Sequence, residues 1–123
     1  MRAIRSRDTA PEKLVRKLAW QTRPGYRLHR KDIPGRPDIA YVGAKKAIFV
    51  HGCFWHGHDC ARGARVPKAN RDYWTGKIGR NRVRDEQSLR RLEESGWQAL
   101  VLWECELKNA LEVLSRLRAF LAR

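Results

Sequence analysis

Apolar and polar positions along this 123-residue chain alternate with helical and strand periods, which predict elements in the order α-β-β-β-α-β-α. The first helix is marked by Leu14, Val15 and Leu18 at helical spacing. Before them, Thr9 to Glu12 has the Thr-x-x-Glu spacing of a capping box, with a proline inside the first turn. We therefore expect a helix from Thr9 to about Trp20.

Strand patterns occupy the next part of the chain. Residues 26–28 alternate like a short strand, and the breaker Ile33 to Pro37 follows. Residues 39–42 and 46–50 are apolar runs separated by a turn at residues 43–45. They predict a β-hairpin.

The second half of the chain predicts a helix, a strand and a closing helix. Asn70 is a candidate N-cap for a helical region that stops at Gly96, although Gly76 and Gly79 could split it. Residues 97–103 are nearly all apolar, as expected of a central strand covered on both faces.

A stripe of leucines marks the closing helix: Leu107, Leu111, Leu114, Leu117 and Leu121. The predicted fold class is α/β (α+β), a mixed sheet with helices packed on it. The length fits a single domain over residues 1–123.

The charge balance indicates what kind of partner the protein binds. Lys and Arg number 27 against 13 Asp and Glu, a net charge of +14. So large an excess indicates a polyanionic partner, with nucleic acid first and a membrane surface or merely a solvated basic surface as alternatives. No apolar run reaches spanning length, and residues 1–5 lack the apolar core of a signal peptide. We expect a soluble, cytoplasmic protein.

Metal-binding residues gather in residues 49–60, which hold three of the four histidines and two of the three cysteines. Cys53, His58 and Cys60, joined by the distant Cys105, would make a closed Cys3His zinc site. An odd number of cysteines suits metal ligation better than a disulfide framework. The alternative is that the cysteines are simply buried thiols.

A candidate for hard-cation chemistry is Asp38, directly after the breaker. A Pro-Asp pair at the start of a strand can place a carboxylate beside the backbone of the next strand, where Mg²⁺ would find oxygen ligands. Alone, this signal is weak, because such an aspartate is more often a turn or cap residue. His51 and His56 remain for proton transfer.

With these residues assembled, the sequence resembles the very-short-patch repair endonucleases of the restriction-endonuclease-like superfamily. The resembling segments are residues 1–4 with 7–12, 34–38, 49–56, 74 with 77–81, and 96–105. The string Gly-Cys-Phe-Trp-His at residues 52–56 is the most specific of them. The resemblance implies an αβββαβ core with a structural zinc site, and Mg²⁺-dependent nicking of DNA beside the thymine of a T:G mismatch.

The resemblance also assigns catalytic and metal-binding roles. It places the metal-binding aspartate on Asp38, the catalytic histidine on His56 and an assisting glutamate on Glu12. Val50 stands where a second Mg²⁺ contact is made, so its backbone carbonyl is implied. The zinc ligands fall on the four residues chosen above. Glu12 could equally close its capping box.

The same resemblance assigns DNA contacts. Phe54 and Trp55 fall where aromatic side chains enter the base stack, with Trp74 nearby and Lys77 and Asn81 in the same matching segment. Each aromatic could instead be a core residue, most readily Trp74 because it lies on a helix. His51 could hydrogen-bond behind the metal ligands.

The expected partner is double-stranded DNA, bound by a monomer in a prokaryotic cytoplasm. The family usually carries an N-terminal arm before the segment that matches Met1, and that arm embraces the DNA. Two rival hypotheses are a related nuclease without mismatch preference, as part of a restriction or defence system, and a zinc-stapled DNA-binding module without catalysis.

Overall fold

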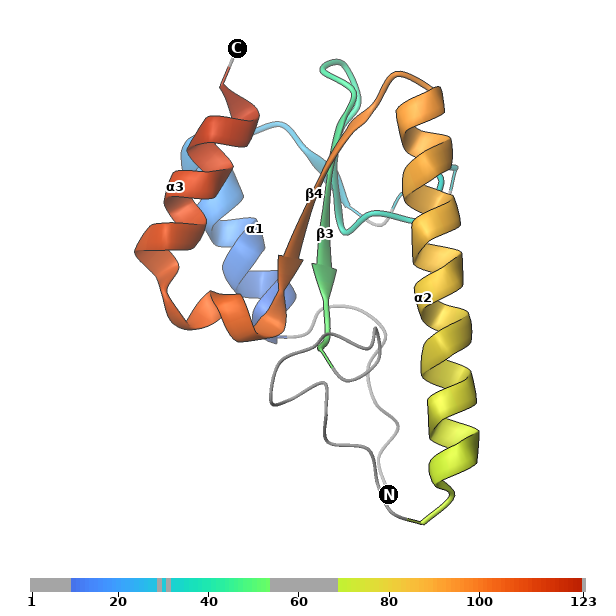
Figure 1. Ribbon diagram of the computed structural model, residues 1–123. Helices are drawn as coiled ribbons and strands as arrows, with labels where there is room; N and C mark the ends of the chain where they lie inside the picture. Colours follow the sequence, from blue (N-terminus) through green and yellow to red (C-terminus); the bar gives the residue numbers. More distant parts are fainter. Residues whose placement is uncertain (1–9, 29, 31, 54–68, 123) are drawn as a thin grey trace.

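A computed structural model describes residues 10–28, 30, 32–53 and 69–122 (Figure 1). The order of elements is the predicted one. The elements are α1 (Ala10–Thr22), β1 (Arg27–Leu28), β2 (Ile39–Tyr41), β3 (Lys46–His51), α2 (Arg71–Glu94), β4 (Gln98–Trp103), a short 3-10 helix η1 (Glu104–Lys108) and α3 (Ala110–Leu121).

The described strands form a mixed sheet in the order β1-β2-β3-β4. The hairpin makes β2 and β3 antiparallel, with Ile39 opposite Ile48, while β3 and β4 run parallel, with His51 opposite Trp103. The prediction that residues 97–103 form a central strand is wrong, because β4 lies at the edge of this sheet. Since β2 already occupies one side of β3, the strand that returns after α2 pairs on the other side. The strand is apolar because both layers of helices pack over it.

Helices cover both faces of the sheet (Figure 1). On one face, α1 and α3 pack on β2, β3 and β4, and the larger hydrophobic cluster lies there. Its buried members are Val15, Leu18, Ala19, Ile39, Tyr41, Ile48, Leu102, Val113, Leu117 and Leu121. On the opposite face, α2 covers a smaller cluster of Ile33, Ala40, Ala47, Phe49 and Leu92. Successive residues of β3 alternate between the two clusters, as a strand between two layers requires.

Helix α2 is continuous over 24 residues, about 36 Å, and extends past the carboxyl ends of β3 and β4 (Figure 1). Gly76 and Gly79 therefore do not split it, since the hydrogen-bonded turns on either side carry the helix through both glycines. Asn70 does precede its first turn, but with a left-handed φ of 58° and no hydrogen bond from its side chain. The helix stops at the predicted place, where Gly96 has a φ of 83°.

The closing helix buries a stripe slightly different from the predicted one. Val113, Leu117 and Leu121, each four residues apart, face the core, whereas Leu111 is 80% exposed. Leu111 lies well off the buried stripe at 100° per residue, so the leucine repeat alone overestimates the apolar face. Among the described residues, no helix combines the length and apolarity needed to cross a membrane.

Candidate active site

The hairpin register places Asp38 beside the carboxyl end of β3. Asp38 directly precedes β2, and its Oδ2 accepts a hydrogen bond from the backbone N–H of Val50 at 2.6 Å. This is the position that the sequence predicts for the carboxylate. Its role as a metal ligand, and that of the Val50 carbonyl, remain predictions.

Glu12 meets Asp38 from the first turn of α1. Its side chain is buried, with 5% of the residue exposed, and it hydrogen-bonds to Asp38. One turn further along α1, Nη2 of Arg16 lies 4.0 Å from Oε1 of Glu12. Because a side chain that closes a capping box stays at the helix surface, this burial against a second carboxyl group favours a site role for Glu12.

Burial, followed by the hydrogen bond to Glu12 and the charge of Glu12, raises the pKa of Asp38 to about 7. The Val50 N–H and Arg16 oppose the shift. Two carboxyl groups in contact away from water cannot both ionise cheaply, so they hold a proton between them unless a cation takes its place. Carboxylate oxygens of this kind match the preference of Mg²⁺, so the residues present fit that ion.

His51, the last residue of β3, is buried between aromatic side chains. Its ring packs edge-on against Trp103 of β4, with centroids 5.1 Å apart, and against Phe49 at 5.8 Å. It also lines a small pocket of about 110 Å³ with Pro11, Val50, Gly52 and Glu104. His51 thus lies next to the backbone segment that holds Asp38, as a supporting role would require.

Two of the four proposed zinc ligands come together. Cys53 is fully buried just after β3, and its Sγ accepts a hydrogen bond from the backbone N–H of Cys105 at 3.4 Å. Cys105 belongs to η1, which follows β4, so the parallel pairing of β3 and β4 brings the distant cysteine to the loop.

Five of the predicted site residues fall outside the described residues. They are His56, His58, Cys60, Phe54 and Trp55. Within the described ranges, no group of three or more His, Cys, Asp or Glu side chains could hold a metal ion. The zinc set would be completed only by His58 and Cys60.

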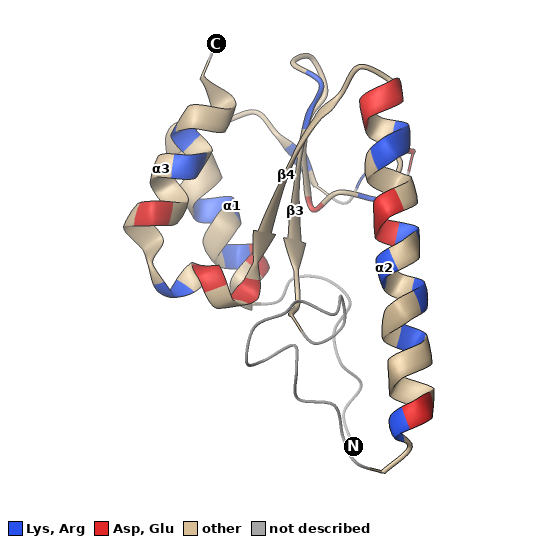
Figure 2. Cartoon of the chain, in the orientation of Figure 1, with Lys and Arg blue, Asp and Glu red and all other residues tan. Residues whose placement is uncertain are grey.

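The first half of α2 carries the predicted DNA contacts. Trp74, Lys77 and Asn81 are half-buried and lie on the same helix face as Ile78 and Leu92, the two buried residues of α2. Figure 2 shows bands of Lys and Arg along this half. Residues 71–84 contain Arg71, Lys77, Arg80, Arg82 and Arg84, with Asp72 as the acidic exception. A basic helix that extends past the strand ends is suited to lie along DNA.

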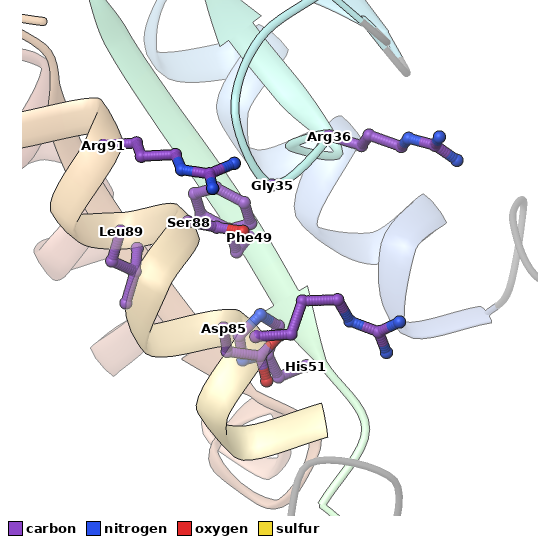
Figure 3. A pocket seen from close by; sticks show the side chains of 9 residues that line it. Gly35, Arg36, Phe49, His51, Asp85, Ser88, Leu89 and Arg91 are labelled. Carbon is purple, nitrogen blue, oxygen red and sulfur yellow. The ribbon is translucent and has the colours of Figure 1, made fainter. Parts of the chain in front are cut away.

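Two basic features of the candidate site were not predicted from the sequence. Arg16 was missed although its position, four residues after Glu12, was a usable signal. The second feature is a pocket of about 490 Å³ between α2 and the turn at Gly35 and Arg36, which the chain order alone did not reveal (Figure 3).

Comparison with known proteins gives the family. A sequence model described as "DNA mismatch endonuclease Vsr" matches residues 1–62. The type II nicking enzyme V.XorIIP of Xanthomonas oryzae pv. oryzae is 46% identical over 98% of this chain and 88% of its own length. The type II nicking enzyme V.NmeAIP of Neisseria meningitidis is 45% identical over 89% of this chain and 77% of its own.

A third relative is the DNA mismatch endonuclease Vsr of Escherichia coli K12, 43% identical over 89% of this chain and 69% of its own length. These matches overturn the hypothesis of a DNA-binding module without catalysis. The mixed sheet flanked by helices also fits a restriction-endonuclease-like fold. The chain therefore belongs to the Vsr family of DNA mismatch endonucleases and is a DNA endonuclease.

Proposed function

We propose that this endonuclease uses Mg²⁺ to nick one strand of double-stranded DNA beside the thymine of a T:G mismatch, acting as a monomer. The observation that carries the chemistry is the buried contact of Asp38 with Glu12 at the carboxyl end of β3. An acidic pair kept from water is costly for folding, so its presence in a strongly basic chain points to a cation that it serves.

Asp38 and the backbone carbonyl of Val50 would hold the Mg²⁺, and Glu12 would assist by binding a water of the ion. When bound, the ion supplies charge neutralisation at the scissile phosphate and a lowered pKa for its water. The Val50 N–H keeps Asp38 oriented, because it occupies one lone pair of Oδ2 and leaves the other oxygen for the metal. His56 takes the proton of the attacking water, as an imidazole that titrates near neutrality can.

The zinc site would fix the loop that carries His56. Cys53 and Cys105 are already in contact across β3 and β4, and His58 and Cys60 complete the ligand set. A closed tetrahedral site has no open position for substrate, so zinc serves structure here.

Mismatch preference would come from the aromatic residues Phe54 and Trp55 in that loop. Opening a base step costs a few kcal/mol, less at a wobble pair than at a matched pair. Trp74, Lys77 and Asn81 lie on the same face of α2 as the buried Ile78 and Leu92, where they would contact the same stretch of DNA.

A second candidate is an endonuclease that nicks DNA without mismatch preference, in a restriction system. Two relatives are named type II nicking enzymes, and these names support this second candidate. Both candidates share the acidic pair and the basic surface, so only the choice of substrate separates them.

The deciding experiment compares nicking of two duplexes that differ in a single pair, T:G against C:G, at saturating Mg²⁺. We expect faster nicking of the T:G duplex and a product cut beside the thymine. The double substitution Phe54→Ala with Trp55→Ala should lower the ratio of the two rates and leave zinc content unchanged. Equal rates for the unmodified protein on both duplexes would establish the second candidate instead.

A further inference from the structure

The pocket between α2 and the turn before Asp38 is lined by an unusual excess of arginine. Arg36 comes from the turn, and Arg84 and Arg91 come from α2. Phe49 and Leu89 contribute apolar surface, and Asp85 with His51 lies at the other end from Arg91 (Figure 3). The pocket has a volume of about 490 Å³ and opens to solvent.

The two walls of this pocket are held at a fixed separation by Gly35. A Cβ at Gly35 would lie 2.9 Å from Cβ of Ser88 on α2 and 3.0 Å from Cε1 of Phe49, so the turn touches the helix as closely as a backbone can. Gly35 has a φ of 80°, and Arg36 follows with a φ of 50°, a conformation that costs free energy for a residue with a side chain. The turn therefore fixes the backbone of Arg36 beside α2, while its side chain is exposed and extends outward from the turn (Figure 3).

The charges of the pocket are not balanced within the fold. Among the described residues, neither Arg36 nor Arg91 forms a side-chain ion pair, and both are exposed. Arg84 donates a hydrogen bond to Oδ1 of Asn81. Asp85 is the one carboxylate among the lining residues, against three guanidinium groups. The excess of positive charge therefore favours binding of an anion in the pocket.

We propose that Arg36 and Arg91 together bind one internucleotide phosphate of the substrate DNA, distinct from the phosphate that is cut. A guanidinium fork matches the oxygens of a phosphodiester, and two arginines on opposite walls can hold one phosphate between them. Arg84 lies two helical turns before Arg91, about 10 Å along the axis, and therefore belongs to the next part of the DNA path.

The pocket lies close enough to the catalytic centre for the bound phosphate to align the DNA strand there. His51 lines both this pocket and the small pocket beside Val50, so the two sites adjoin at the end of β3. Asp38 follows Arg36 by two residues on the same rigid turn. A strand anchored at Arg36 and Arg91 is thereby aligned with the acidic pair, because both contacts are built on the same segment. This inference rests on the proposed active site around Asp38.

The test measures DNA affinity as a function of salt for the variant Arg36→Asn with Arg91→Ala. Asparagine tolerates the left-handed conformation at residue 36, and alanine favours the exposed helix position at residue 91. We expect the slope of log K against log salt concentration to fall by about 0.9, the value for one lost phosphate contact. Arg90→Ala is the matched control, since Arg90 is an exposed neighbour outside the pocket, and its slope should stay unchanged.

A second measurement locates the phosphate. Duplexes with a single neutral methylphosphonate are scanned position by position, and one position should weaken binding of the unmodified protein on the order of tenfold but leave binding of the double variant unchanged. Arg91→Ala alone, which perturbs no turn, should reduce sensitivity at the same position. A double variant with the slope of Arg90→Ala, or a scan in which every position affects both proteins equally, overturns the inference. Failure of the proposed active site would look different, since Asp38→Asn would then still nick DNA.

Discussion

The two layers on either side of the sheet are built for different tasks. The layer of α1 and α3 buries an apolar stripe from each helix against β2, β3 and β4. The layer of α2 is a single helix of 24 residues in which only Ile78 and Leu92 are buried. The first layer resembles an ordinary protein core, whereas the second resembles a solvated arm fixed to the sheet at one end.

This difference separates the acidic and basic parts of the site. Glu12 and Arg16 come from the well-packed layer, so the acidic pair is held by surroundings that cannot easily relax. Lys77, Arg84 and Arg91 come from the solvated layer, where long side chains can adapt to a phosphate backbone. A rigid acidic centre beside an adaptable basic arm fits an enzyme that must align one phosphate precisely while following a variable duplex.

Asp38→Asn should give the largest effect and the clearest separation of the two layers. Nicking should fall by at least about a hundredfold, because even a supporting partner of a metal ligand is worth 10 to 100-fold. DNA affinity should persist, since the basic helix supplies most of it. Initial nicking rates and a binding titration measure the two effects. A variant that nicks normally would remove Asp38 from the catalytic centre. A variant that no longer binds DNA would contradict the proposal that the basic helix supplies most of the DNA affinity.

Removal of zinc is expected to be the next largest perturbation. Cys105→Ala should lose the bound zinc and lower the free energy of unfolding by on the order of 4 kcal/mol, because metal-binding energy in such sites is folding energy. Metal analysis by mass spectrometry and chemical unfolding measure both quantities. Full zinc content in the variant would leave Cys53 and Cys105 as an ordinary buried contact.

Most of the fold could be predicted from the sequence, because each helix and strand has a local cause. The capping spacing, the hairpin turn and Gly96 are all short-range signals, and the structure confirms the elements they predict. The position of β4 could not be predicted in this way. Strand order depends on which side of β3 is already occupied, and no periodicity within residues 97–103 records that.

Site residues could be predicted where the chain holds few residues of their type, and could not where it holds many. Cysteines and a Pro-Asp pair are few, so Cys53, Cys105 and Asp38 could be selected, and the structure brings each to the end of β3. Arginines are numerous in this chain, so nothing distinguished Arg36 and Arg91 from the rest. Only the contact of Gly35 with α2, a tertiary feature, brings the turn and the helix that carry them to one pocket.

Leu117→Ala tests the α1 and α3 layer as the main source of stability. Leu117 is fully buried, so its truncation should cost about 3 kcal/mol of unfolding free energy. Leu111→Ala is the matched control on the same helix, where an exposed leucine should change stability by no more than about 0.5 kcal/mol. Urea unfolding monitored by tryptophan fluorescence gives both values. Equal losses would mean that α3 buries a different face.

The pH dependence of Mg²⁺ binding probes the acidic pair directly. The pKa of Asp38 is raised to about 7, so the ion must displace a proton below that pH, and its affinity should fall about tenfold per pH unit there and level off above. Calorimetric titration at pH 6 and 8 in buffers of different ionisation enthalpy measures the proton released. An affinity independent of pH would exclude Asp38 as a ligand.

The same shift has a consequence for the metal-free protein. Because the folded pKa lies above the ordinary value of 3.8, the folded state holds this proton more tightly than the unfolded chain does. Its contribution to stability is therefore complete at low pH and is lost as the pH rises from about 4 to about 7. Asp38→Asn should lack this component, which chemical unfolding across that range would detect.

Gly79→Ala should have the smallest effect, and it separates the two faces of α2. Gly79 is exposed and lies about 100° or more around α2 from the buried Ile78 and Leu92, and a Cβ there would meet no atom within 4 Å. Alanine should therefore raise the free energy of unfolding by up to about 1 kcal/mol, the usual gain over glycine inside a helix. Nicking should stay unchanged, because the proposed DNA contacts at Trp74, Lys77 and Asn81 lie on the other face. If the variant were more stable but nicked DNA more slowly, the outward face of α2 would also contact DNA, and the basic arm would be surrounded by its substrate rather than lying against it.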